Sequence, residues 1–462
     1  MRDDTVDTTT TDALGAAPIR RWTGRDLLVL AAISLLAAAL RLLLIEQWSF
    51  GPGEGATWRA ITQPMSGGAD GFPASEQSSY PLGFLLLRAL VESGLLPGTT
   101  EGWLRLPFAF AGCLVTPLVA LFARPLLGRA SGHLAALAIA VHPAQVAASQ
   151  TADPAVFAAA AALAAGVLSM RGWRWSSYVA VVVCGGCHPL GWFWAAGLVL
   201  ATRPLAWASR APRWSWPLLA LAALPLLPDL VHGPAVAALL LAGASFALRL
   251  PDGRAFALGA LLPLGAGGLW WWFDASVGAS ARVLAAPVVA VLAAWSCVQF
   301  ARTAAERLDV SSLARRLVGA APTVMMVGEL LTATFLYFAV YDGGRAAWRD
   351  ARAAVASARV AGRDLVIVTG RGADVMRSYL RPNHWRDPGR DAHPGVLVLP
   401  LADDAAARAR QTELPGALFV LQHDERALLG DAADAFVVVA LWSGPRADGD
   451  GSLYVMRRRQ PD

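Results

Sequence analysis

The chain has 462 residues, of which 56% are hydrophobic and only 16% are charged, whereas about a quarter of the residues of a typical soluble protein are charged. Its formal net charge of +5 comes entirely from arginine, because the sequence contains no lysine. An ordinary soluble domain is therefore excluded. A nucleic-acid-binding surface is disfavoured, because the arginines lie in short segments between apolar runs, where they set membrane orientation.

The first residues are polar and lack the basic start of a signal peptide, so they predict a disordered cytoplasmic tail over residues 1–18. Arg20, Arg21 and Arg25 then precede the apolar run Leu27–Ile45, which predicts an uncleaved first span. The abundance of alanine, glycine and arginine is typical of a GC-rich bacterial genome.

Eleven membrane spans are predicted within a transmembrane domain over residues 19–342. Their expected ranges are 27–46, 103–123, 132–148, 154–170, 175–187, 189–202, 214–230, 234–248, 255–273, 283–300 and 317–341. Arginine-bearing and arginine-free connections alternate, which places the N-terminus in the cytoplasm. An odd number of spans then places the C-terminal part outside, in the periplasm if the cell has two membranes. We therefore expect a multi-pass protein of the inner (plasma) membrane.

The first outer loop, residues 47–102, is much longer than the other connections and opens with WSFGPGEGATW. Glycines flank its carboxylate, Glu54, and let the backbone pass close to a bulky partner, while the neighbouring aromatic side chains suit the face of a sugar ring. An ordinary turn at the membrane interface is an equal alternative. Later in the loop, residues 78–96 are apolar but carry two interrupting charges, which predicts a helix at the membrane surface.

From residue 343 to residue 462 the composition becomes that of a soluble domain. A short helical pattern comes first, and five strand-like runs follow, with the turn-forming segment SGPRADGDG between the last two. The runs are 364–369, 395–400, 416–421, 435–442 and 452–457. The pattern predicts a small extracytoplasmic α/β domain on a mostly parallel sheet, with the last two strands forming a hairpin.

The segment Cys184-Gly-Gly-Cys187-His188 matches the C-x-x-C-H pattern of covalent haem attachment. It lies in an apolar hairpin that offers no soluble pocket and no evident second axial ligand. The sequence therefore favours small residues that pack between helices.

The segment VTGRGAD, residues 368–374, follows a predicted strand and opens a helix. It contains G-x-G but no third glycine, so a dinucleotide site is disfavoured. An ordinary turn between a strand and a helix is the simpler interpretation.

Several segments follow one another in a shared pattern: GEGATW from Gly53, YPLGFLLLRAL from Tyr80, RLPFAFAGC from Arg105, VHPAQVAASQTADPAVF from Val141, CHPLG from Cys187 and RAAWRDARAAV from Arg345. In order and spacing they resemble glycosyltransferase family 39 of the GT-C superfamily. These polyprenyl-phosphate-sugar-dependent transferases include protein mannosyltransferases and the aminoarabinose lipid A transferase. The expected fold is thus a GT-C-like polytopic α-helical membrane protein of about eleven transmembrane helices with a small C-terminal α/β domain.

The resemblance also implies roles for individual residues. Glu54, the acid of the first outer loop, would act catalytically by binding or deprotonating the acceptor hydroxyl. The substrate-binding candidates, with basic groups for the lipid phosphate, are Arg59, Arg105, His142, Asp153 and His188. Two positions depart from the family pattern, because Gly53 replaces the first acid of an Asp-Glu pair and Asp153 replaces an arginine.

The predicted activity is that of a hexosyl- or pentosyltransferase, which moves a sugar from a polyprenyl-phosphate donor to a lipid, glycan or protein hydroxyl at the outer membrane face. Membrane lipids, the donor lipid and the acceptor are the expected partners. No cofactor is expected, although a divalent cation bound by loop acids stays open.

Two other classes of function remain. Gly53 and Asp153 leave room for a catalytically degenerate protein of the same fold, which would bind lipid-linked glycan or scaffold an envelope complex. A transporter is disfavoured, because few charges besides Glu329 lie within the predicted spans.

Overall fold

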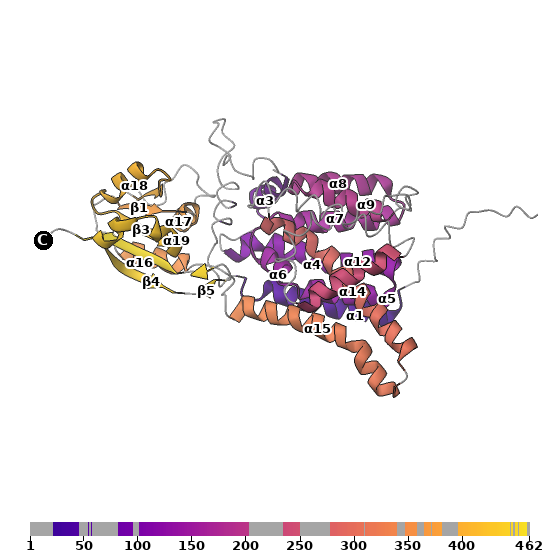
Figure 1. Ribbon diagram of the computed structural model, residues 1–462. Helices are drawn as coiled ribbons and strands as arrows, with labels where there is room; N and C mark the ends of the chain where they lie inside the picture. Colours follow the sequence, from indigo (N-terminus) through magenta and orange to yellow (C-terminus); the bar gives the residue numbers. More distant parts are fainter. Residues whose placement is uncertain are drawn as a thin grey trace, which may run out of the picture.

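The computed structural model shows a helical bundle with a mixed α/β unit at one of its ends (Figure 1). It describes residues 22–45, 54, 57, 82–95, 101–202, 234–249, 278–308, 310–339, 347–357, 365–370, 372–380, 396–443, 445–446, 449–450 and 452–459. The tail 1–18, most of the first outer loop and the predicted spans 214–230 and 255–273 lie outside these ranges.

The helices of the bundle overlap the apolar ranges predicted from the sequence, as far as the structure describes them. They are α1 (Gly24–Leu42), α3 (Leu82–Glu92), α4 (Glu101–Leu127), α5 (Arg129–Ala140), α6 (Pro143–Gln150), α7 (Ala155–Met170), α8 (Arg174–Cys187), α9 (Gly191–Ala201), α12 (Pro234–Arg249), α14 (Gly278–Arg307) and α15 (Ser312–Ala339). The helix expected near the end of the first outer loop is confirmed as α3.

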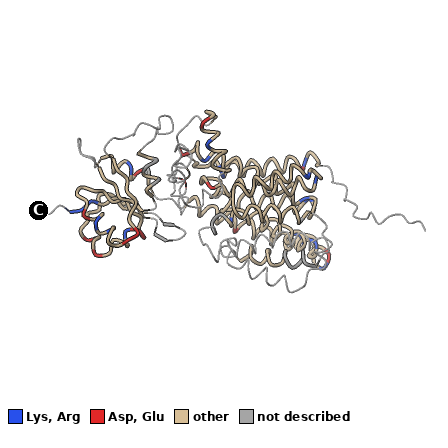
Figure 2. The backbone as a smooth tube through the Cα atoms, turned by 90° about the horizontal axis from the view of Figure 1, so that it is seen from above, with Lys and Arg blue, Asp and Glu red and all other residues tan. Residues whose placement is uncertain are grey.

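Within the described residues, three helices are long and apolar enough to cross a membrane alone: α4, residues 281–307 of α14, and α15. A fourth span results if α6 and α7, which are bent by 120° relative to one another, are taken together. The total of eleven spans stays a prediction. Most of the charged residues that the structure describes in the bundle lie towards its ends (Figure 2), as expected for a bundle in a membrane.

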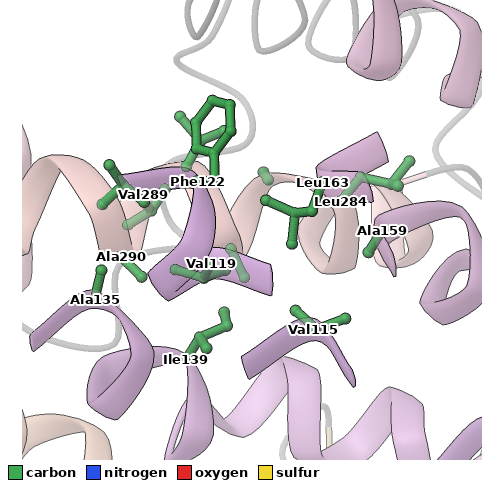
Figure 3. Packing of buried hydrophobic residues seen from close by; sticks show 14 of the residues in the cluster. Val115, Val119, Phe122, Ala135, Ile139, Ala159, Leu163, Leu284, Val289 and Ala290 are labelled. Atoms are coloured by element: carbon green, nitrogen blue, oxygen red, sulfur yellow. The ribbon is translucent and has the colours of Figure 1, made fainter. Parts of the chain in front are cut away.

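The core of the bundle lies between α4, α5, α7 and α14. Val119, Ile139, Leu163 and Val289 are among the buried side chains that meet there (Figure 3). Close packing in this core depends on small residues. A Cβ atom on Gly166 would lie 2.7 Å from the ring of Phe122, so a larger residue would push the helices apart.

The predicted span 132–148 is not one helix, because the chain leaves helical geometry at Val141 and His142 before α6 begins at Pro143. Proline disfavours helical geometry in the residue before it, and His142 is extended with φ −74° and ψ 119°. The break leaves carbonyl groups that need donors inside the bundle.

Side chains from distant helices supply those donors. Arg41 of α1 donates to the carbonyls of Ile139 (3.2 Å) and Ala140 (3.0 Å), the last residues of α5. Thr334 of α15 donates to the carbonyl of Val141 at 2.6 Å. These two buried polar residues thus stabilise an interruption that the apolar pattern alone did not reveal.

The α/β unit, called here the sheet unit, comprises the described residues from 347 to 459. Its elements are α16 (Trp348–Ser357), β1 (Leu365–Thr369), α17 (Ala373–Leu380), β2 (Val396–Pro400), α18 (Ala405–Thr412), β3 (Leu418–Gln422), α19 (His423–Ala427), the 3₁₀ helix η6 (Gly430–Ala435), β4 (Phe436–Trp442), β5 (Pro445–Arg446), β6 (Gly449–Asp450) and β7 (Leu453–Arg458). The five expected strands are present as β1, β2, β3, β4 and β7, and β5 and β6 pair within the last turn.

The strand order is β2-β1-β3-β7-β4. β1 is parallel to β2 and β3, whereas β7 is antiparallel to β3 and β4. The expected hairpin is therefore confirmed. β1, β2, β3 and β4 run in the same direction, as expected for a mostly parallel sheet, and β7 runs against them. The sequence did not predict that β7 inserts between β3 and β4, a pairing that alternation along single strands does not reveal.

The glycines of the GRG turn after β1 are required by packing. A Cβ atom on Gly370 would overlap the carboxylate of Glu425, and one on Gly372 would overlap the ring of Trp348. Both neighbours are buried, and Glu425 accepts a hydrogen bond from the backbone of Gln422 at 3.0 Å. Buried side chains thus fill the space beside both glycines, which supports an ordinary turn between a strand and a helix rather than a dinucleotide site.

The sheet unit packs against the end of the bundle at which α4 begins, called here the sheet-side end. Leu87 of α3 and Leu104 and Phe108 of α4 belong to the same buried apolar cluster as Trp348 and Tyr379 of the sheet unit. The two parts therefore share a hydrophobic core.

Candidate functional site

A buried ion pair at the sheet-side end joins the first outer loop to α4. Nε of Arg105 donates to Oε1 of Glu54 at 2.6 Å, and Nη2 donates to Oε2 at 3.0 Å. The side chains are 0% and 3% exposed, respectively. Two parallel hydrogen bonds between a guanidinium and a carboxylate are strong and fix the orientation of both groups.

The third guanidinium nitrogen ties the pair to the end of α1. Nη1 of Arg105 donates to the carbonyl of Ile45 at 2.7 Å. The side chain of Gln150 in turn donates to the carbonyls of Leu40 (2.9 Å) and Leu43 (2.8 Å) where α1 ends. The chain segment that leads into the first loop is thus held in place before it reaches Glu54.

The turn between α6 and α7 meets the first loop at the same place. Glu54 and Thr57 are both helical, one turn apart, and the hydroxyl of Thr57 donates to the carbonyl of Ala152 at 3.4 Å. Asp153 follows directly, and its Oδ1 accepts from the backbone N–H of Ala155 at 2.9 Å. This carboxylate therefore helps to start α7.

The two candidate histidines occupy different depths. His188 ends α8 in the turn towards α9, is 8% exposed, and accepts at Nδ1 from the backbone N–H of Leu190 (3.2 Å). A Cβ atom on neighbouring Gly186 would lie 3.0 Å from Leu82 of α3, so this turn is at the sheet-side end. His142 lies inside the bundle, 1% exposed, at the break between α5 and α6.

The structure thus brings together three of the six residues predicted from the sequence. Glu54 and Arg105 are in contact, and Asp153 lies in the turn that Thr57 touches. His188 is at the same end of the bundle, and His142 is in its interior. Arg59 and Gly53 lie outside the described residues.

The C-x-x-C-H segment packs as the sequence favoured. Sγ of Cys184 lies 3.1 Å from the carbonyl oxygen of Ala158 and 3.2 Å from that of Gly191, so its single S–H has an acceptor on either side and the thiol is buried between α7 and α9. Gly185 faces the ring of Trp192 without room for a side chain. These contacts support the interpretation that small residues allow close helix packing.

Glu329, a carboxylate within a candidate span, caps a helix. Its Oε1 and Oε2 accept from the backbone N–H groups of Ala235 (2.9 Å) and Val236 (3.0 Å), at the start of α12. A helix N-terminus stabilises negative charge. The residue thus has a structural role, so it gives no support to a transporter.

No group of three or more His, Cys, Asp and Glu side chains in the described parts of the chain could hold a metal ion. The loop acids Asp70 and Glu76 lie outside those parts. Metal binding by the first loop is therefore untested.

The sequence interpretation missed Thr57, Glu101 and Tyr379. Thr57 was marked only by its place one helical turn after Glu54, and Glu101 by its place one turn before Arg105. The hydroxyl of Tyr379, in α17, donates to Glu101 at 2.8 Å across 278 sequence positions. No local pattern could have indicated this contact.

No family model and no curated protein matches the sequence. Solved structures share its fold. The oligosaccharyltransferase of Archaeoglobus fulgidus, in complex with Zn and sulfate, is 13% identical with a TM-score of 0.54, and the match covers 92% of this chain and 72% of that one. ArnT from Cupriavidus metallidurans, bound to undecaprenyl phosphate, is 15% identical with a TM-score of 0.50, over 93% and 97% of the two chains. The chain therefore shares the fold of these two solved structures.

Proposed function

We propose that this protein transfers a sugar from a polyprenyl-phosphate donor to an acceptor hydroxyl. The observation that carries the proposal is the buried Glu54–Arg105 pair, held where the first loop, α4 and the α6–α7 turn meet. The fold and its solved relatives support the donor class, since ArnT was solved with undecaprenyl phosphate bound.

The chemistry is a displacement at the anomeric carbon of the sugar. The acceptor oxygen forms the new glycosidic bond, the bond from that carbon to the phosphate oxygen breaks, and the acceptor proton must leave. In the proposed mechanism Glu54 accepts or orients that proton. A carboxylate oxygen that accepts from a guanidinium can accept a second hydrogen bond, so pairing with Arg105 is compatible with this role.

Arg105 takes a different role from the one suggested by the resemblance. Each of its three guanidinium nitrogens donates to Glu54 or Ile45, and the side chain is fully buried. We assign it to positioning Glu54. Neutralisation of the departing phosphate then falls to Arg59, and His188 can donate a hydrogen bond from Nε2, because its Nδ1 accepts from Leu190. His142 and Asp153 lie at the neighbouring helix breaks.

The test is transfer of radiolabelled sugar from polyprenyl phosphate in membranes, at equal amounts of folded protein. Glu54→Gln should lower transfer by about 10²- to 10⁴-fold, which is the usual contribution of proton transfer. The matched control is Glu92→Gln, the same change in an exposed pair with Arg88 on α3. Undiminished transfer by Glu54→Gln would remove this residue from the mechanism.

The degenerate alternative is supported by Asp153, whose carboxylate accepts from the first N–H of α7 at a position where the family that the chain resembles has a basic residue. Gly53→Asp restores the family's acid pair and distinguishes the two hypotheses. Increased transfer would mean that the missing acid limits an active enzyme. If the parent protein, Glu54→Gln and Gly53→Asp all fail to transfer sugar from several donors, the result would favour a protein that binds lipid-linked glycan without acting on it.

The proposed site lies at the outer face, with residues 1–18 in the cytoplasm and residues 343–462 outside. Two exposed side chains test this arrangement, Glu92 near the sheet-side end and Trp175 near the start of α8. In intact cells, a membrane-impermeant thiol reagent should label Glu92→Cys but label Trp175→Cys only after lysis. The reverse pattern would invert the topology and place the site in the cytoplasm.

A further inference from the structure

The sheet unit contacts the helix that carries Arg105, one turn from that residue. The hydroxyl of Tyr379 donates to Oε1 of Glu101 at 2.8 Å. The two residues are 7% and 8% exposed, so the hydrogen bond is shielded from solvent. Around it, Leu104 and Phe108 of α4 share the buried apolar cluster with Tyr379.

Glu101 is the first residue of α4, and Arg105 is the fifth. The first turn of a helix lacks intrahelical partners for its N–H groups, so it is the part of the helix that frays most easily. An acidic residue there is favoured by the helix dipole, and a hydrogen bond to its charge is stronger than one between neutral groups. Anchoring Glu101 therefore stabilises the turn from which Arg105 projects.

We propose that Tyr379 is a positioning residue, through which the sheet unit holds the start of α4 and thereby sets the Arg105–Glu54 pair. The path consists of Tyr379, Glu101, the first turn of α4, Arg105 and Glu54. The expected effect of Tyr379 on sugar transfer rests on the proposed function. Its expected effect on how firmly the first loop is held does not.

How firmly the first loop is held near Glu54 can be measured without an assay of sugar transfer. Thr57 is 2% exposed and lies one turn from Glu54. The native cysteines that the structure describes as buried are Cys184, Cys187 and Cys297, and Cys113 is half-buried. The labelling rate of Thr57→Cys by a hydrophilic maleimide, corrected for the protein with native Thr57, reports how often this turn opens.

In detergent, adding Tyr379→Phe or Glu101→Gln to Thr57→Cys should raise the labelling rate about tenfold to 100-fold, the range for loss of one hydrogen bond to a charged group. The matched control is Tyr454→Phe, which removes a hydroxyl from the same sheet unit near His423 (3.3 Å). It should leave the rate unchanged. The double change Tyr379→Phe with Glu101→Gln should label no faster than the faster single variant, because both act through one contact.

Each result decides the proposal. An unchanged rate in both single variants, or an equal rise in Tyr454→Phe, would overturn it. If labelling responds as expected while no variant or parent protein transfers sugar, the coupling stands and the proposed function fails. If Glu54→Gln abolishes transfer but Tyr379→Phe changes neither labelling nor kcat, the function stands and the coupling is wrong.

Discussion

Both ends of the bundle bury a carboxylate against arginine, but the surroundings of the two acids differ. At the opposite end from the sheet unit, Asp26 is 0% exposed and accepts from the backbone N–H and the hydroxyl of Thr23 at 3.1 Å and 2.9 Å, which completes a capping box for α1. It also pairs with Arg124 at 3.4 Å and with Arg129. Asp26 is thus explained by the stability of its own helix and of the neighbouring helix ends.

At the sheet-side end, Glu54 reaches an arginine 51 positions away in another helix. This pair joins a loop to the bundle and lies beside Ala152 and Asp153, where two broken helices turn. The comparison shows that burial and an arginine partner do not by themselves mark a functional acid. The two acids differ in what they stabilise. Asp26 caps its own helix, whereas Glu54 accepts from an arginine of another helix.

The largest expected difference between the two ends is in sugar transfer. Glu54→Gln and Asp26→Asn remove the same charge from equally buried sites. We expect a loss of about 10²- to 10⁴-fold for Glu54→Gln and less than about twofold for Asp26→Asn, because only the former acid takes part in proton transfer. Transfer per folded protein is measured after size-exclusion chromatography. Equal losses in the two variants would mean that both carboxylates act only through stability.

The next difference is in stability. Arg105→Met leaves Glu54 buried without its guanidinium, which should cost about 3–5 kcal/mol. Arg124→Met leaves Asp26 paired with Arg129 and removes the contact of Arg124 with the ring of Trp22, 4.0 Å away, so about 1 kcal/mol is expected. Thermal unfolding in detergent should separate the two variants clearly. Similar melting temperatures would show that the Glu54–Arg105 pair is no more essential than the opposite cluster.

A smaller effect tests how far the sheet-side end depends on the sheet unit. Gly372→Ala places a methyl group against Trp348, a member of the cluster that includes Leu104, and overpacking of this kind should cost about 1–3 kcal/mol. Gly24→Ala at the opposite end meets nothing within 4 Å and should be neutral or slightly stabilising. The readout is again the melting temperature. A neutral Gly372→Ala would mean that Trp348 can move without cost.

The smallest effect is expected for Arg88→Ala on α3. Its bond to Glu92, at 2.7 Å, is an i,i+4 pair, and the Glu92 side chain is 63% exposed. Such a pair contributes about 0.3–0.5 kcal/mol, and less at high salt. Transfer and melting temperature should therefore stay close to those of the parent protein. A marked loss of transfer would extend the site beyond the buried pair to the surface of α3.

Two features of the fold lay outside what the sequence predicted, for physical reasons. Residues 132–148 are apolar enough for one span, but Pro143 interrupts the helix, and Arg41 and Thr334 make the break tolerable. In the sheet, the last strand, β7, lies between β3 and β4 and pairs with both of them. In each case the local pattern was correct and the pairing of distant segments was not contained in it.

The sequence alone determined the helices and strands, the membrane character and the acid in the first loop. Long apolar runs and alternating strands are local properties, and burial in lipid or in a sheet requires only the right spacing. This is why α4, α7, α15 and the five main strands lie close to their predicted ranges.

The tertiary structure decided which polar groups meet. Arg105 could have served a phosphate by its charge, but the fold places it against Glu54. Asp153 could have been a ligand, but it starts α7. Tyr379 had no expected role until the sheet unit packed onto Glu101. A side chain's charge is set by its own chemistry, whereas its partner depends on how segments far apart in the chain pack together, and that packing is a property of the whole fold.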